Sequence, residues 1–370
     1  MNDKILFLHY LRGFASLLVM IGHLGFSFFI NHETVSTIAK VPPYALETPF
    51  WVELYISFSK MTGFNLGSFG VGLFFLISGF VIIISIEKYG SINFLIGRVF
   101  RLYPSYILGL AVTVLFLFLS SLYFHTQFSI TWGDYLKNIS LFRDIFWVQM
   151  IDFIVWTLEI ELKFYIIIAL LYAIKNKITL THIVWFPITL TIISYIGYIN
   201  LKTLYLGDFF IYKIFYIISA DSASFIFMFI GALFYFKYTN RIKLTYFILT
   251  LLFFIALFLI NTNFTPGAYS SLSYLYALAL FTVSYYFKES FGNHKLLNFF
   301  ANISYPMYIL HGINGYIIMR ILLNYTNNYF FLLIPTISIV LAMSYAIHVY
   351  IEVPTHKLGR KFMFHSYGGG

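Results

Sequence analysis

The chain of 370 residues is 60% hydrophobic, only 10% charged, and carries a formal net charge of +9. Soluble domains contain about 25% charged residues, so this composition excludes an ordinary soluble enzyme. The chain has no cysteine, which excludes thiol nucleophiles, disulfides and thiolate metal sites.

Ten apolar segments have the roughly 20 residues that a helix needs to cross a bilayer. They cover about residues 5–30, 67–86, 103–124, 152–173, 182–200, 214–236, 244–261, 270–287, 299–323 and 329–350. Because hydrocarbon leaves the backbone no other partner, all of them are expected to be helical. The sequence predicts an all-α, polytopic bundle that forms one domain over residues 1–365. Residues 366–370, which end in three glycines, are expected to be a disordered tail or a linker remnant.

The distribution of basic residues predicts the orientation of the bundle. With the N-terminus inside, the inner loops hold more than twice as many Lys and Arg residues as the outer loops. Basic residues gather in cytoplasmic loops, so both termini are expected in the cytoplasm. The first segment follows Lys4 like a signal peptide, but it is long and no small-residue cleavage site follows it, which predicts a retained span.

The first segment holds two ionisable residues, Arg12 and His23, which are eleven positions apart. This spacing is about three helical turns, so both side chains lie on one stripe, about 16 Å apart along the axis. Ionisable groups are costly in hydrocarbon, which favours a functional site that faces a protein cavity. The alternative is an Arg at the inner membrane edge and a polar His near the outer one.

Two long outer segments follow the first and third spans, at about residues 31–66 and 125–151. Such loops could cap an external cavity, or their aromatic residues could anchor the protein among the lipid headgroups.

The second span contains the small residues of segment 70–80, which allow helices to approach closely. Ser78 within it is a second-tier candidate for a cavity-lining residue. Arg98 and Arg101 follow, three positions apart and therefore on one helix face. Two guanidinium groups on one face suit a phosphate-rich ligand, although the preference for basic residues on the inner side would also explain them.

The fourth span begins with Trp156 and carries two acidic residues. Glu159 and Lys163 are four positions apart, which favours a pair within the helix. Glu161 points to the other side, the side of Thr157 and Tyr165. Trp156, Thr157 and Tyr165 are second-tier cavity candidates.

Glu161 lies at a depth similar to that of His23 in this topology. A pair of these two side chains would make a general base and the group that orients it. The alternative is a structural hydrogen bond between two helices. Asp221, Tyr305 and His311 complete the second tier of cavity residues. The His residues are scattered without ligand spacing, so no metal site is expected.

The motifs in order resemble the acyltransferase-3 family of bacterial integral-membrane acyltransferases. The resemblance covers Leu11 to Arg360. It rests on Leu11-Arg12-Gly13 with His23 as an Arg-x10-His signature, the block from Gly70 to Phe80, and the Arg98/Arg101 block through Pro104. It rests further on Trp156 to Tyr165, Ser304 to His311, and Tyr350 to Pro354.

The chain departs from the family at two points. His9 and Tyr10 stand where many members have an acidic residue, a variant similar to the exopolysaccharide-modifying subgroup. The family's fused hydrolase-like domain is not expected here, so the resemblance is to a stand-alone form.

The resemblance implies transfer of an acyl group, usually acetyl, from cytoplasmic acyl-CoA to a hydroxyl of a cell-surface or lipid-linked glycan. The expected location is the bacterial inner membrane, with membrane lipids but no nucleic acid among the partners. His23 would act as base or form an acyl-histidine, with Glu161 as its partner, and Arg12, Arg98 and Arg101 would bind the donor, acetyl-CoA.

Two non-enzymatic alternatives remain open at this point. A transporter or flippase of a polysaccharide or lipid-linked sugar could use the same polar stripe as a pathway. A scaffold protein would tolerate loss of Arg12 and His23. No oligomeric state is predicted.

Overall fold

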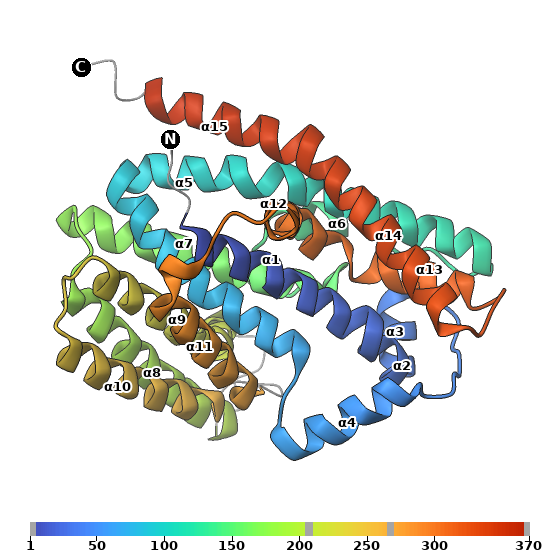
Figure 1. Ribbon diagram of the computed structural model, residues 1–370, viewed down its shortest axis with the longest axis horizontal. Helices are drawn as coiled ribbons and strands as arrows, with labels where there is room; N and C mark the ends of the chain where they lie inside the picture. Colours follow the sequence, from blue (N-terminus) through green and yellow to red (C-terminus); the bar gives the residue numbers. More distant parts are fainter. Residues whose placement is uncertain (1–4, 204–209, 265–269, 366–370) are drawn as a thin grey trace.

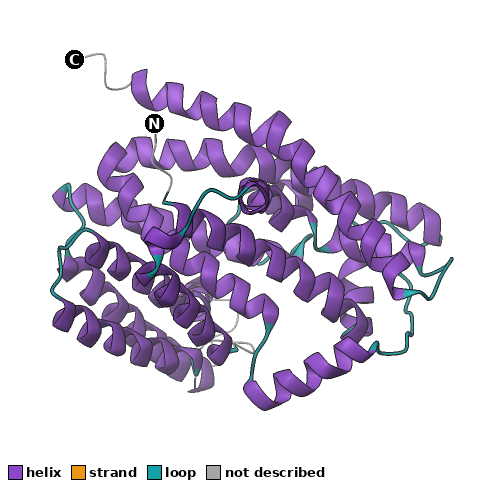
Figure 2. Cartoon of the chain, viewed as in Figure 1, coloured by secondary structure: helices purple, strands orange, loops and turns teal. Residues whose placement is uncertain are grey.

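The computed structural model describes residues 5–203, 210–264 and 270–365, and every regular element in them is helical (Figure 2). The all-α fold predicted from the composition is confirmed. Within these residues six helices are long and apolar enough to cross a membrane, and the count of ten spans stays a prediction. The predicted tail at residues 366–370 lies outside the described residues.

The N-terminal part of the chain builds the first span and a long bent helix. Its elements are α1 (Leu6–Ile21), the π-helix η1 (Gly22–Ser27), α2 (Phe28–Ile30), α3 (His32–Ala39), α4 (Phe50–Thr62) and α5 (Leu66–Phe124). α5 joins two of the predicted spans through Gly90, whose φ is 70°. Glycine adopts this left-handed conformation without steric cost, and the chain reverses its direction there (Figure 1).

The middle of the chain forms a group of neighbouring helices. Its elements are α6 (Trp132–Ile139), η2 (Phe153–Val155), α7 (Trp156–Lys175), α8 (Leu180–Thr203), α9 (Phe210–Tyr238), α10 (Leu244–Thr262), α11 (Ser271–Tyr286) and η3 (Lys288–Ser290). α9 packs against α5, α8 and α10 (Figure 1). Its apolar window is 83% buried inside the protein, so α9 is the central helix of this group.

The C-terminal part contains two interrupted helices. Its elements are α12 (Lys295–Leu310), α13 (Ile313–Leu322), α14 (Tyr329–Ile347), the π-helix η4 (His348–Glu352) and α15 (Val353–His365). The predicted span 299–323 is thus broken at His311 and Gly312. α14, η4 and α15 follow one another without a gap, and α15 ends on the side of the molecule where α1 begins (Figure 1).

Glycines hold α5 and α9 in close contact. A Cβ atom on Gly79 of α5 would lie 1.8 Å from the carbonyl oxygen of Met228, and one on Gly231 of α9 would lie 2.1 Å from that of Leu76. Neither backbone oxygen can move away without bending its helix. The interpretation that the small residues of the second span allow helices to approach is confirmed at this contact.

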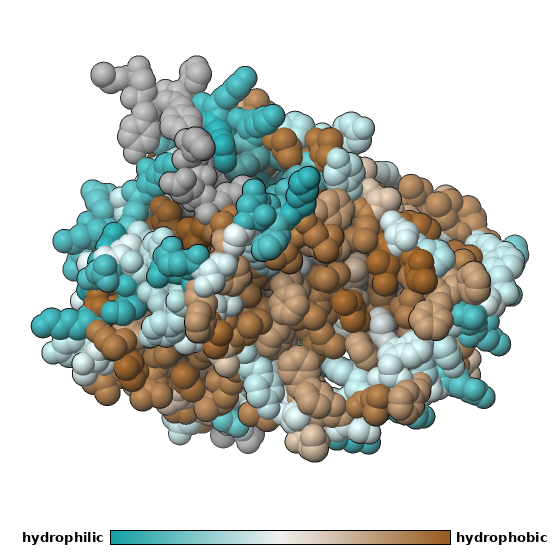
Figure 3. Space-filling model, in the orientation of Figure 1, coloured by the Kyte–Doolittle hydropathy of each residue, from teal (hydrophilic) through white to brown (hydrophobic). Residues whose placement is uncertain are grey.

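The outer surface is apolar over a broad area. In Figure 3 hydrophobic side chains cover the middle of the visible face, and hydrophilic residues gather at its upper left and right edges. Exposed apolar side chains include Leu115, Leu119, Leu252 and Ile334. Soluble monomers rarely expose such contiguous apolar surface, so the chain is a multi-pass membrane protein.

Candidate functional site

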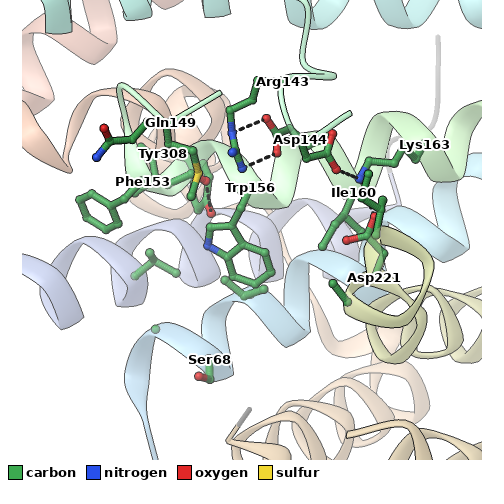
Figure 4. A pocket seen from close by; sticks show the side chains of 18 of the residues that line it. Ser68, Arg143, Asp144, Gln149, Phe153, Trp156, Ile160, Lys163, Asp221 and Tyr308 are labelled. Atoms are coloured by element: carbon green, nitrogen blue, oxygen red, sulfur yellow. Dashed lines mark hydrogen bonds and ion pairs between the residues drawn. The ribbon is translucent and has the colours of Figure 1, made fainter. Parts of the chain in front are cut away.

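Three cavities occupy the interior. The wide cavity, of about 950 Å³, is lined by His23 and Trp156, and Figure 4 shows it with Trp156 near the centre. The narrow cavity, of about 80 Å³, is lined by Ser78 and Glu161. The basic cavity, of about 490 Å³, lies against α15 and is lined by Arg360 among others.

Shared walls connect the three cavities in a row. Tyr308 lines both the wide and the narrow cavity. Arg12, Ile77, Val81 and Arg101 line both the narrow and the basic cavity. A molecule that spans the row would therefore extend from the start of α1 and α15 to the side chain of His23.

Both histidines of the site lie where a helix is irregular. His23 belongs to the π-helix η1, a conformation found frequently at functional sites. His311 ends α12 at the break before α13. These two irregularities bring the rings together, with His23 Nδ1 2.8 Å from His311 Nε2. His311 is completely buried, whereas His23 lines the wide cavity.

The hydrogen-bond chain assigns the tautomer of His23. Nδ1 of His311 lies 3.0 Å from the carbonyl oxygen of Met307. A carbonyl oxygen only accepts, so the His311 Nδ1 donates and its Nε2 is left as an acceptor. His23 Nδ1 must then donate to that Nε2. The other nitrogen of His23, Nε2, is thereby left without a proton and able to act as a base.

The predicted pair of His23 and Glu161 is not formed. Glu161 accepts a hydrogen bond of 2.5 Å from Ser78 Oγ and another from the hydroxyl of Tyr165, and all three side chains line the narrow cavity. Similar depth in the membrane does not tell which faces of two helices meet. The orienting partner of His23 is instead His311, which the sequence placed only in the second tier.

The predicted pair of Glu159 and Lys163 within α7 is also not formed. Arg143, in the loop before α7, contacts Glu159 at 2.9 Å (Figure 4). Lys163 pairs with Asp144 of the same loop and, at 2.5 Å, with Asp221 of α9. Partners from other segments compete successfully because all five groups line the wide cavity. These pairs fasten the loop to the wall of the cavity.

Arg98 is fixed among aromatic rings. It is 7% exposed, and its Nη2 donates to Ser85 Oγ at 2.7 Å. The guanidinium carbon lies 5.2 Å from the ring centre of Phe94 and 5.0 Å from that of Tyr165, distances typical of cation–π contacts. Arg98 therefore presents a preoriented positive charge to the narrow cavity, which it lines.

Arg12 and Arg101 lie where the narrow and basic cavities meet. Arg12 Nη2 donates to the carbonyl oxygen of Ala301 at 3.3 Å, while its buried Nε has no hydrogen-bond partner. Buried donors are satisfied in the great majority of cases, so this nitrogen points to a missing ligand. The structure thus brings the predicted donor-binding residues Arg12, Arg98 and Arg101 together, and their role stays a prediction.

A hydrogen bond separates the narrow cavity from the wide one. The hydroxyl of Tyr308 lies 2.7 Å from Thr157 Oγ1, and Tyr305 lines the narrow cavity beside them with its hydroxyl bonded to the carbonyl oxygen of Leu102 at 3.0 Å. Tyr308 was absent from the predicted site. Its position three residues before His311 on the same helix is the signal that could have identified it.

Other site residues carried no usable signal. Arg143 and Asp144 lie in a loop, and their partners come from α7 and α9. The second-tier candidate Asp221 belongs to this group and Trp156 lies beside it. In the part of the chain that the structure describes, no group of three or more His, Asp or Glu side chains could hold a metal ion.

Comparison with known proteins gives one match. A family model described as an acyltransferase domain matches residues 5–352, nearly the whole chain. No curated protein and no solved structure matches the chain.

Proposed function

The chain belongs to the acyltransferase-3 family and is a membrane acyltransferase, and we propose that it transfers an acetyl group from cytoplasmic acetyl-CoA to a hydroxyl of a cell-surface or lipid-linked glycan. The hydrogen-bonded pair of His23 and His311 carries this proposal. Acyl transfer to a hydroxyl needs a base that accepts the hydroxyl proton. The unprotonated Nε2 of His23, at the wide cavity, supplies one.

The reaction needs a single proton relay. His23 Nε2 takes the proton of the acceptor hydroxyl, and the oxygen attacks the carbonyl carbon of the thioester. The new carbon–oxygen bond forms as the carbon–sulfur bond breaks, and the leaving sulfur takes the proton back from His23. His311 keeps its ring partner in the reactive tautomer throughout this cycle.

The sizes of the cavities support a separation of the two substrates. The wide cavity, of about 950 Å³, is within the range of ligand pockets, about 300–1,000 Å³, and is large enough for a saccharide. The narrow cavity, of about 80 Å³, suits only a slender chain such as the pantetheine arm of the donor. That arm must cover about the 16 Å that a helix places between Arg12 and His23.

Two groups in the narrow cavity are suited to guide the thioester. The Ser78 hydroxyl donates to Glu161, and Tyr165 donates to the same carboxylate. This triplet fixes the polar wall past which the donor arm would run. Arg98, stacked on Tyr165, adds a positive charge that favours a phosphate-bearing donor.

The test measures transfer of radioactive acetyl from acetyl-CoA to glycan in membranes that contain the protein. We expect His23→Ala to lower the rate at least about 10²-fold, the usual contribution of a general base. The matched control is His294→Ala, at an exposed histidine outside the three cavities.

A thermal melt of both variants in detergent checks the fold. Full acetylation by a folded His23→Ala protein would refute the mechanism. Glycan export that depends on the protein, without any acetyl transfer by the wild type, would favour a transporter instead.

A further inference from the structure

The basic cavity contains more positive charge than its own acid can neutralise. Arg12, Arg101 and Arg360 line it, and Glu352 is the acidic residue of its lining. Glu352 already accepts a 2.7 Å bond from His348 Nδ1. An interior cavity with surplus cations attracts an anion, and the planar guanidinium fork suits phosphate oxygens best.

Two of these arginines have nitrogens to offer a ligand. Arg12 Nε is buried without a hydrogen-bond partner. For Arg101 no hydrogen bond or ion pair is found within the described residues. Arg360 lies exposed at the rim, on α15. The three groups come from α1, α5 and α15, so tertiary packing alone assembles them.

The position of this cavity fits the nucleotide end of a long donor. It is continuous with the narrow cavity through Arg12, Ile77, Val81 and Arg101. Its volume of about 490 Å³ lies within the range of ligand pockets, about 300–1,000 Å³. A molecule whose acyl end reaches His23 through the narrow cavity would have its phosphates here.

We propose that the basic cavity binds the nucleotide phosphates of the acyl donor and that Arg360 on the C-terminal helix α15 is a donor-binding residue together with Arg101. This inference rests on the proposed function, because it takes acyl-CoA as the donor. It adds a residue and a helix that no motif of the sequence indicated. α15 is then part of the binding site.

The test compares two ligands that differ in the nucleotide. Binding of CoA and of pantetheine to the full-length protein in neutral detergent is measured by calorimetry. We expect Arg360→Gln to weaken CoA binding about tenfold, as loss of a charge-assisted hydrogen bond does, and to leave pantetheine binding unchanged. The control Lys357→Gln removes the same charge from an exposed position of α15 outside the cavity lining and should change neither.

Each other outcome overturns the inference in a recognisable way. Equal CoA affinity of wild type and Arg360→Gln would exclude Arg360 from the donor site and leave the proposed function standing. Equal weakening of both ligands would indicate a structural role. No CoA binding by the folded wild type would remove the proposed donor itself.

An anionic lipid headgroup carries the same phosphate chemistry. Retention of phosphatidylglycerol by the purified proteins, measured by mass spectrometry, separates the two sources. If Arg360→Gln loses the lipid but keeps its affinity for CoA, the cavity is a lipid site and the inference is wrong.

Discussion

Two substitutions of His311 separate its two hydrogen bonds. A glutamine can place its oxygen near the position of Nε2 and accept from His23 Nδ1, whereas an asparagine can place its amide nitrogen near Nδ1 and donate only to the carbonyl oxygen of Met307. If His311 orients the base, His311→Gln retains activity and His311→Asn loses it. If His311 only stabilises the helix break, the order is reversed.

The size of the loss follows from the contact that is removed. In His311→Asn the Nδ1 proton of His23 has no acceptor, which costs about 1–3 kcal/mol for a buried donor. At about 1.4 kcal/mol per factor of ten, the reactive tautomer becomes about 5–150-fold less populated, and kcat falls by that factor. The KM for acetyl-CoA stays unchanged, because His311 lines none of the three cavities.

The assay is acetyl transfer from acetyl-CoA at several donor concentrations, with a thermal melt of each variant as a check of folding. The reasoning is refuted if folded His311→Asn keeps wild-type kcat, or if His311→Gln is the less active of the two. A change confined to KM would also contradict it.

Three further predictions concern packing and charge. Gly79→Ala places a Cβ 1.8 Å from a backbone oxygen of α9 and should destabilise the protein by about 1–3 kcal/mol or more, seen as a lower Tm in detergent. Arg143→Ala leaves Glu159, whose side chain is 3% exposed, as a buried unpaired charge, and should cost about 3–5 kcal/mol in a denaturation assay. Exchange of both Arg98 and Arg101 for lysine keeps the charge but loses the planar forks, and should weaken CoA binding more than about tenfold while the protein still inserts normally.

Each has a matched comparison. Gly133→Ala, on the short helix α6, meets only its neighbour Thr131 Oγ1 at 3.6 Å and should leave Tm unchanged. Arg143→Ala combined with Glu159→Gln removes the unpaired charge and should recover most of the lost stability. A double lysine variant that binds CoA like the wild type would show that charge alone suffices at this position.

The sequence by itself determined the class of the fold and the composition of the site. Apolar segments of fixed length predict helices because lipid offers the backbone no other partner, and helices lie over the described parts of all ten predicted spans. The spacing of Arg12 and His23 on one stripe is equally local, since it depends only on the helical repeat. Both side chains do line cavities of the interior.

Only the tertiary structure decided which side chains meet. The partner of His23 depends on a π-helix and on a broken helix, neither of which changes the apolar pattern that the sequence shows. Glu161 lies against Ser78, and Lys163 reaches Asp221, because of how α5, α7 and α9 are rotated about their axes. Such rotations are set by packing, here by glycine contacts of α5 with α9. A chemical site between helices therefore follows from sequence only as a set of residues, and its pairings follow from the fold.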